Sequence, residues 1–448
     1  MRSIKLTSAV LAAAVLALAT AGMAAARVHP HAKRHHGIRG GACHVTMNVA
    51  PHILTAGETA LAYGQLGCKP AAEAGQTVTL FEHTVGTPGG FAAAGTAATD
   101  SHGFYQITTA ALTGNSAFYV VADNAQSIER NVKVAAQVGL VGPEEGKQLS
   151  IATGRRNSVM FKGSVSPGNA GDEVVLQRQN SIRGNEWRRI GKGVVTAENT
   201  FAITHSFAVP GDSNIRVLVR RGRHNIASPS NVLTFEISQT QNPSLTIETA
   251  TDPIQFGGST VISGLAASEP NTVVTLMARG KGQPYVAVDS VKTDSTGAYT
   301  FPATSPQTST FYEVRTADRK SAVLYQGVKY ILTSAVDTAT VQAGSPFTFS
   351  GLVTPAEAGH TVYLEKQNAL GTGFHVSSTG SENAVGEYSI AHTVYTPGTY
   401  TFRIKVPGGP DHNGTAGTAV TITVTPRTPG PLTPEAPGNS GLPPEGSV

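Results

Sequence analysis

The chain has 448 residues, a length that predicts two to four domains. Charged residues make up only 14% of the chain and aromatic residues 6%. The 49 glycines and 26 prolines occur without a collagen-like period. This composition excludes a fibrous repeat, argues against long helices and favours short strands joined by turns. The net charge of +4 is small for this length and identifies no partner.

The first 26 residues are typical of a secretory signal peptide. Arg2 and Lys5 precede an apolar stretch at about 9–19, and the small residues at 24–26 suit a cleavage site. The alternative is a retained anchor, because 9–26 is about as long as a membrane-spanning helix. We therefore expect an exported protein, secreted or associated with the cell surface, with no membrane span after cleavage.

Residues 27–40 form a basic, His-rich leader. Its imidazoles could hold Cu²⁺, Ni²⁺ or Zn²⁺, and its cations could dock on an anionic polymer. A flexible segment offers no fixed ligand geometry, however, and strong metal binding requires one. We therefore expect no metal site and no cofactor.

Cys43 and Cys68 are the only cysteines of the chain. In an exported protein they most simply form a disulfide, which closes a loop of about 25 residues and contributes roughly 3 kcal/mol to stability. The alternatives are two free thiols or a metal pair, and two ligands at this spacing are a weak metal signal.

One sequence pattern recurs four times: a Gly that ends a strand, a turn, an apolar strand that ends in Leu, and further on a turn followed by an aromatic residue. The marker residues keep a common period near 95, which is the size of an immunoglobulin-like sandwich. Apolar and polar residues alternate within the copies, as in half-buried antiparallel strands. The markers are Leu80, Leu176, Leu276 and Leu364, and Tyr105, Phe201, Tyr299 and Tyr388.

These markers predict an all-β protein of four tandem β-sandwiches. The predicted copies span 41–139, 140–238, 243–332 and 333–425. The Pro-rich tail, 426–448, is predicted to be extended and disordered.

The segments 355–364 and 294–299, with their counterparts in the other copies, resemble those of bacterial immunoglobulin-like repeat proteins, which are secreted or surface-associated. The resemblance covers roughly 385 residues and implies immunoglobulin-like or fibronectin-III-like sandwiches. It is specific for architecture and poor for function, because such modules act as spacers, adhesins and polysaccharide-binding units. No copy contains the Cys…Trp…Cys framework of antibody domains.

The second copy concentrates positive charge, with 13 basic and 8 acidic residues, a balance of +5. Arginine clusters can grip anionic groups, and an exposed tryptophan can stack on a sugar. Cell-wall polymer, an acidic polysaccharide or another surface protein is the expected partner, whereas no nucleic-acid-binding module is recognisable. The candidate anionic-polymer site comprises Arg183, Trp187, Arg188, Arg189, Lys192, Arg216, Arg220, Arg221 and Arg223.

Three functions remain open at this point. We expect a structural or adhesive protein that acts through many weak contacts and is not an enzyme. The first alternative is a specific carbohydrate-binding protein that uses the second copy. Against any binding site in this copy stands a purely structural interpretation, in which the cations are a solvated surface and Trp187 lies in the sandwich core. The second is an uncharacterised hydrolase, for which His205, Ser206 and Asp212 supply triad residue types but no known catalytic motif.

Overall fold

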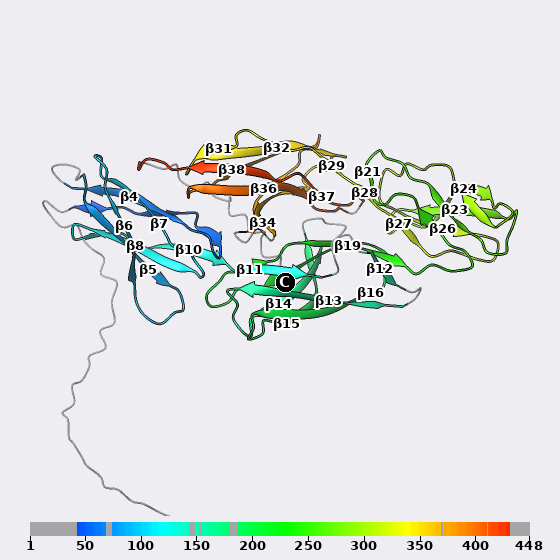
Figure 1. Ribbon diagram of the computed structural model, residues 1–448, viewed down its shortest axis with the longest axis horizontal. Coiled ribbons are helices and arrows are strands. Elements are labelled where there is room, and N and C mark those ends of the chain that lie inside the picture. Colours follow the sequence, from blue (N-terminus) through cyan, green and yellow to red (C-terminus); the bar gives the residue numbers. More distant parts are fainter. Residues whose placement is uncertain are drawn as a thin grey trace, which may run out of the picture. The chain divides into compact units, whose positions relative to one another are not determined.

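The computed structural model describes residues 43–68, 74–142, 148–151, 155–179, 186–368, 371, 373–409 and 411–430. These residues form β-strands and no helix (Figure 1), so the predicted all-β class is confirmed. The signal peptide, the leader, Arg183 and the tail beyond 430 lie outside the described residues. Within the described ranges, no helix has the length and apolar character needed to traverse a bilayer.

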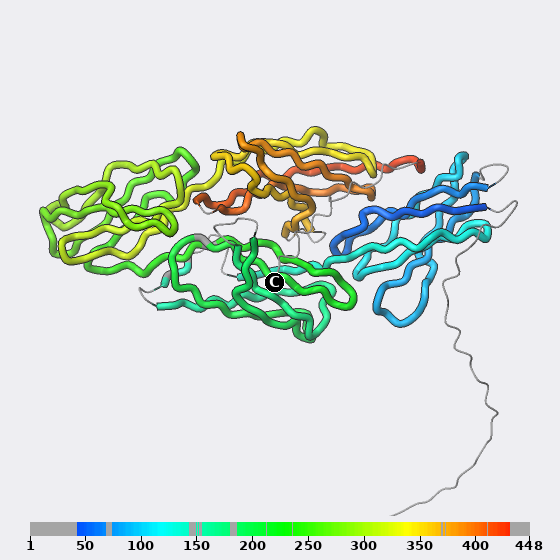
Figure 2. Tube along the Cα trace, turned by 180° about the vertical axis from the view of Figure 1, so that it is seen from behind, coloured from blue at the N-terminus to red at the C-terminus, as the bar shows by residue number. Residues whose placement is uncertain are grey.

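The described strands fall into four successive groups along the chain, which Figure 2 distinguishes by colour. Each group has two layers of sheet around its own cluster of buried side chains, and we name the groups sandwiches 1 to 4. The residue boundaries predicted for the four copies stay predictions.

Sandwiches 1 and 2 each pair a small sheet with a larger one. The small sheet of sandwich 1 contains β1 (His44–Val45), β2 (Asn48–Ala50), β4 (Leu61–Gly67) and β7 (Phe104–Thr108), and its larger sheet β3 (Ile53–Thr55), β5 (Thr77–Thr84), β6 (Ala92–Ala98), β8 (Ser116–Ala122), β9 (Ala125–Gln126) and β10 (Arg130–Ala135). The small sheet of sandwich 2 contains β11 (Gln137–Val141), β13 (Asn157–Ser166) and β16 (Thr200–Phe207). Its larger sheet contains β12 (Gln148–Ile151), β14 (Glu173–Gln179), β15 (Trp187–Val194), β17 (Gly211–Val219), β18 (Ser228–Pro229) and β19 (Leu233–Gln239).

Sandwiches 3 and 4 repeat this plan, although the strands of sandwich 3 are divided among three sheets. Sandwich 3 contains β20 (Glu248–Thr249), β22 (Ile262–Leu265) and β25 (Ala298–Thr300); β21 (Ile254–Gln255) and β28 (Val328–Lys329); and β23 (Val273–Arg279), β24 (Val286–Lys292), β26 (Thr310–Arg315) and β27 (Leu324–Gln326). Sandwich 4 contains β29 (Ile331–Leu332), β30 (Ala335–Val336), β32 (Pro346–Thr354) and β35 (Glu387–Thr393); and β31 (Thr340–Gln342), β33 (Thr361–Gln367), β34 (Phe374–Ser381), β36 (Gly398–Val406), β37 (Thr415–Ala416) and β38 (Val420–Thr425).

The four marker leucines occupy equivalent positions. Each is fully buried, and the register of its strand with the following edge strand shifts directly after it. A shift of this kind inserts one extra residue in one strand and twists the pair. The sequence period therefore marks a structural repeat: a core leucine followed by a bulge.

The aromatic markers lie against a glycine of the neighbouring strand. In sandwich 4 the Tyr388 hydroxyl donates to the Thr333 carbonyl oxygen at 2.8 Å, and Tyr388 is paired with Gly351. A Cβ at Gly351 would lie 2.0 Å from that same oxygen, so only glycine fits there. The equivalent pairs are Tyr105 with Gly64, Phe201 with Gly163, and Tyr299 with Gly264.

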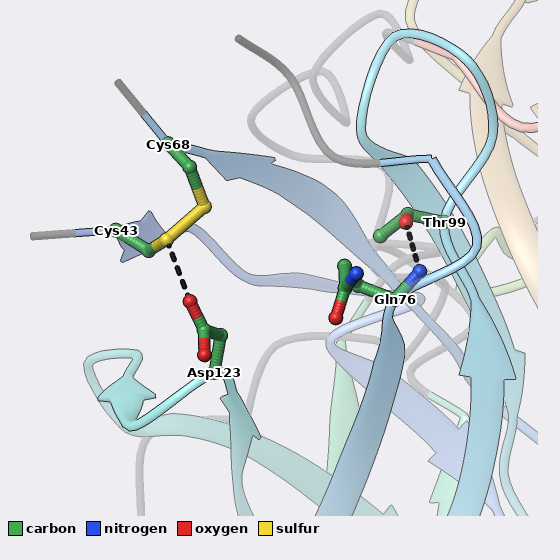
Figure 3. Close-up of a disulfide and its surroundings, with 5 residues drawn as sticks. All are labelled: Cys43, Cys68, Gln76, Thr99 and Asp123. Atoms are coloured by element: carbon green, nitrogen blue, oxygen red, sulfur yellow. Dashed lines mark hydrogen bonds between the residues drawn. A yellow bond between two sulfur atoms is a disulfide. The ribbon is translucent and has the colours of Figure 1, made fainter. Parts of the chain in front are cut away.

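The predicted disulfide between Cys43 and Cys68 is confirmed (Figure 3). It ties the chain before β1 to the end of β4, whose strands are paired through His44 and Gly67. One carboxylate oxygen of Asp123 lies 3.0 Å from Cys43 Sγ. These three residues are the group of potential metal ligands found among the described residues, and the two sulfur atoms are bonded to each other.

The hydroxyl of Tyr388 should contribute about 1 kcal/mol, the usual net value of a hydrogen bond. We expect Tyr388→Phe to lower the protection of β32 and β35 amides against hydrogen exchange by about five-fold. Conversely, Phe201→Tyr should raise protection in sandwich 2, because the new hydroxyl would reach the Gly139 carbonyl oxygen beside Gly163. Unchanged protection in both variants would contradict the stabilising role of the hydroxyl of the aromatic marker.

Candidate functional site

The candidate site lies on the β14, β15 and β17 portion of the larger sheet of sandwich 2 (Figure 1). Val174, Leu176 and Val217 point into the core of the sandwich. Because side chains alternate along a strand, Gln177 and Arg216 point to the opposite, outer side. The register places Gln177 between Arg189 and Arg216.

The bulge after Leu176 decides which cations of β15 share this outer side. Gly191 is opposite Leu176 and Arg189 is opposite Gln177, so Ile190 is the extra residue. Arg189 and Lys192 are three positions apart, yet the bulge lets both point outward. We define the basic face as the outer-side residues Trp187, Arg189, Lys192, Arg216 and Arg220.

Most cations of the candidate set are exposed. Arg220 is the one member that has a carboxylate of the described residues within 4 Å, with Glu173 at 3.5 Å. Because both side chains are about 40% exposed, water screens this ion pair and its contribution to stability is small. Exposed cations for which the described residues supply no such carboxylate are Arg188, Arg189, Lys192, Arg221 and Arg223.

Trp187 is neither in the core nor fully exposed. It lies partly buried on the outer side, where the Arg216 guanidinium stacks 4.2 Å from the centre of its ring. Arg216 Nε also donates to Gln177 Oε1 at 2.9 Å. Burial lowers the pKa of Arg216 to about 10, which still leaves it charged at neutral pH.

Sandwich 4 accounts for the burial at this end of the basic face. Arg216 is 5% exposed although it points away from its own core. Tyr363 of β33 lies close enough for the Arg216 charge to oppose the burial that raises the pKa of its hydroxyl. A Cβ on Gly408 would lie 3.0 Å from Asn214 Nδ2, a second approach of sandwich 4 to β17.

Two residues of the hydrolase alternative, His205 and Ser206, are engaged in other contacts. His205 Nδ1 lies 3.1 Å from the Ile190 carbonyl oxygen, and Ser206 Oγ lies 2.7 Å from Ser158 Oγ. These contacts join Ser206 to another serine and His205 to the backbone, and not to each other.

A second polar site, not anticipated from sequence, lies where sandwich 1 meets sandwich 4. Lys366 Nζ donates to Glu58 Oε1 at 2.5 Å, and His375 Nε2 lies 3.8 Å from the same oxygen. The Thr55 amide donates to Glu58 Oε2 at 2.9 Å. A cavity of about 670 Å³ adjoins these side chains, with Tyr400 among its lining residues. We call this group the Glu58–Lys366 contact.

The charges at this contact favour ionised Glu58 and neutral imidazoles. Burial alone would raise the pKa of Glu58, but the Lys366 ammonium, joined by the His375 ring when that ring is protonated, brings it below its usual range. Burial lowers the pKa of His392 to about 3, with Lys366 adding to the effect. Ser378 Oγ lies 2.8 Å from His392 Nδ1.

The comparisons with known proteins assign no family. No protein-family model matches the chain, and no curated protein matches it. Similar solved structures include the N-terminal eight Ig domains of Down Syndrome Cell Adhesion Molecule, at 11% identity and a TM-score of 0.22, covering 86% of this chain and 48% of that one. Salmonella alpha-2-macroglobulin is 12% identical with a TM-score of 0.21, and the match covers 86% of this chain and 29% of that one. The fibronectin(III)-like modules of Clostridium thermocellum CbhA are 17% identical with a TM-score of 0.20, and the match covers 43% of this chain and 92% of that one. The chain thus spans less than half of the first two proteins.

The buried imidazole of His392 makes stability depend on pH. Its pKa of about 3 in the folded state lies below the ordinary 6.5, so its stabilising effect is present above pH 6.5 and is lost as pH falls towards 3. At about pH 5 the loss should be about 2 kcal/mol relative to neutral pH. Hydrogen exchange of β35 and β36 at both pH values measures it.

His392→Gln provides the matched control for this pH dependence. The variant keeps a polar side chain that cannot be protonated near neutral pH. The loss of stability between neutral pH and pH 5 should therefore shrink to the smaller part that His375 contributes. An undiminished difference in the variant would rule out His392 as its source.

Proposed function

We propose that this chain is an exported, non-enzymatic protein of tandem sandwiches that adheres to anionic polymer of the cell envelope through sandwich 2. The observation that carries the proposal is the set of five exposed cations without a carboxylate partner among the described residues: Arg188, Arg189, Lys192, Arg221 and Arg223. Unpaired exposed cations are free to meet the charges of a polymer.

The arrangement suits many weak contacts along an extended ligand. Lys192 is paired with Val175, Arg189 with Gln177, and the Arg220 amide bonds to the Glu173 carbonyl oxygen. Outward side chains two residues apart on a strand are separated by about 7 Å. These cations therefore form a row along β14, with Arg189 and Lys192 on its β15 side and Arg220 on its β17 side. Each contact in water contributes little, and the row gains strength by multivalency.

The carbohydrate alternative is less well supported by this geometry. A sugar stacks on an aromatic face, and the Arg216 guanidinium occupies one face of Trp187. The polymer proposal needs only the exposed cations of β15 and of the turn that follows β17.

The test is the triple variant Arg189→Gln, Lys192→Gln, Arg221→Gln, measured for retention on isolated cell walls and on an acidic polysaccharide. At about 0.5 kcal/mol per contact, retention at low salt should fall about ten-fold, and the wild type should weaken as salt rises.

The control removes the same charge elsewhere through Lys133→Gln, Lys292→Gln and Lys329→Gln, all exposed residues outside sandwich 2. It should bind as the wild type does. Equal losses in both triple variants would show that net charge alone governs binding, and absence of wild-type retention at low salt would reject the proposed function.

A further inference from the structure

The outer sides of β14 and β17 contain side chains that their own sandwich cannot bury. Gln177, Gln179 and Arg216 are 7%, 6% and 5% exposed, although the core lies on the other side of their strands. An outward side chain of a two-layer sandwich is shielded only by something beyond that sandwich.

Sandwich 4 shows the matching feature on its own larger sheet. Val362 and Leu364 of β33 lie in its core, so Tyr363 and Glu365 point outward. Both are nevertheless buried, at 5% and 3% exposed, and so is Lys405, which is paired with Tyr363. Sandwich 4 also approaches β17 at Gly408, where a Cβ would lie 3.0 Å from Asn214 Nδ2. We therefore infer that the buried outer residues of the two sheets cover each other.

One polar group of the covered surface lacks a well-placed hydrogen-bond partner. Trp187 Nε1 is buried without a hydrogen bond of good geometry, although the Tyr363 hydroxyl lies near the indole. A buried N–H that lacks a good acceptor is destabilising by about 1–3 kcal/mol. Uncovering this surface would return the indole N–H to water or to the oxygen atoms of a ligand.

The Glu58–Lys366 contact holds sandwich 4 from a second direction. Lys366 belongs to β33, the strand that carries Tyr363, and its ammonium is paired with Glu58 of sandwich 1. Tyr395 of sandwich 4 also joins a buried cluster with Ala50, Leu61 and Tyr63 of sandwich 1. One strand thus bears the residue that meets Arg216 and the residue that anchors sandwich 4 to sandwich 1.

We propose that sandwich 4 is an internal cover for part of the basic face, kept in place by the Glu58–Lys366 contact and uncovering Trp187 and Arg216 when that contact opens. The inference rests on the proposed function, because it assigns regulation to the same polymer-binding face. With the cover in place, the exposed cations of β15 are available. Without it, Arg216 and the Trp187 ring join them.

Trp187 is the single tryptophan of the chain, so its fluorescence reports directly on the cover. In the full chain, Glu58→Lys and Lys366→Glu each place like charges together. Each should raise acrylamide quenching of Trp187 about two-fold and shift its emission to longer wavelength, as the uncovered population grows. The exchange variant with both substitutions restores opposite charges and should return quenching to the wild-type value.

Two further variants separate the cover from general damage. Glu129→Lys makes the same charge change at an exposed position of sandwich 1 and should leave quenching unchanged. Tyr363→Ala shortens the side chain at the covered face and should raise quenching with the Glu58–Lys366 contact intact. Wild-type quenching in Glu58→Lys, Lys366→Glu and Tyr363→Ala would overturn the cover.

Polymer binding by the same variants tests the regulatory part. Variants with raised quenching should bind the acidic polysaccharide about three-fold or more tightly, since added cations strengthen a multivalent contact. Raised quenching with unchanged binding would overturn regulation while leaving the cover established. If the wild type and all variants fail to bind, it is the proposed function that fails, whatever the quenching shows.

Discussion

The register shift after each marker leucine is the constraint on which the surface of every sandwich depends. It keeps the leucine in the core and reverses, for the rest of the edge strand, which residues face outward. In sandwich 2 this places Arg189 and Lys192 on one side. In sandwich 4 the extra residue is Ser377 of β34, and the shift places His375 opposite Lys366. Both polar sites therefore depend on the same local irregularity.

The repeat architecture could be predicted from sequence because its determinants are local and recur. A leucine, a glycine and an aromatic residue at fixed spacing report a bulge, a close approach of strands and the side chain that fills the space beside it. The disulfide could be predicted because the chain has two cysteines and a start typical of an exported protein. Phe201 shows the limit of such markers, because it keeps the packing of Tyr105, Tyr299 and Tyr388 while lacking the hydroxyl.

The candidate site was only partly predictable. The positive charge of the second copy is visible in composition, but strand β15 has no clean alternation, so the side on which Trp187 lies could not be read from it. The burial of Arg216 depends on Tyr363, and the ion pair of Lys366 depends on Glu58, 308 residues away. No periodicity connects such residues, because the contacts join residues of different sandwiches.

Strand β15 ends the sheet order of its sandwich, so one of its sides has unpaired backbone amides and carbonyls. An unpaired edge of this kind invites a strand from another molecule and thereby aggregation. The Arg188, Arg189 and Lys192 charges oppose that pairing, since two copies meeting edge to edge would bring like charges together. Edge strand β6 of sandwich 1, Ala92–Ala98, has no charged residue at all. Any tendency of this protein to associate through sheet edges should therefore be greater at β6 than at β15, and sandwich 2 should resist it for as long as its cations are not neutralised by a bound polymer.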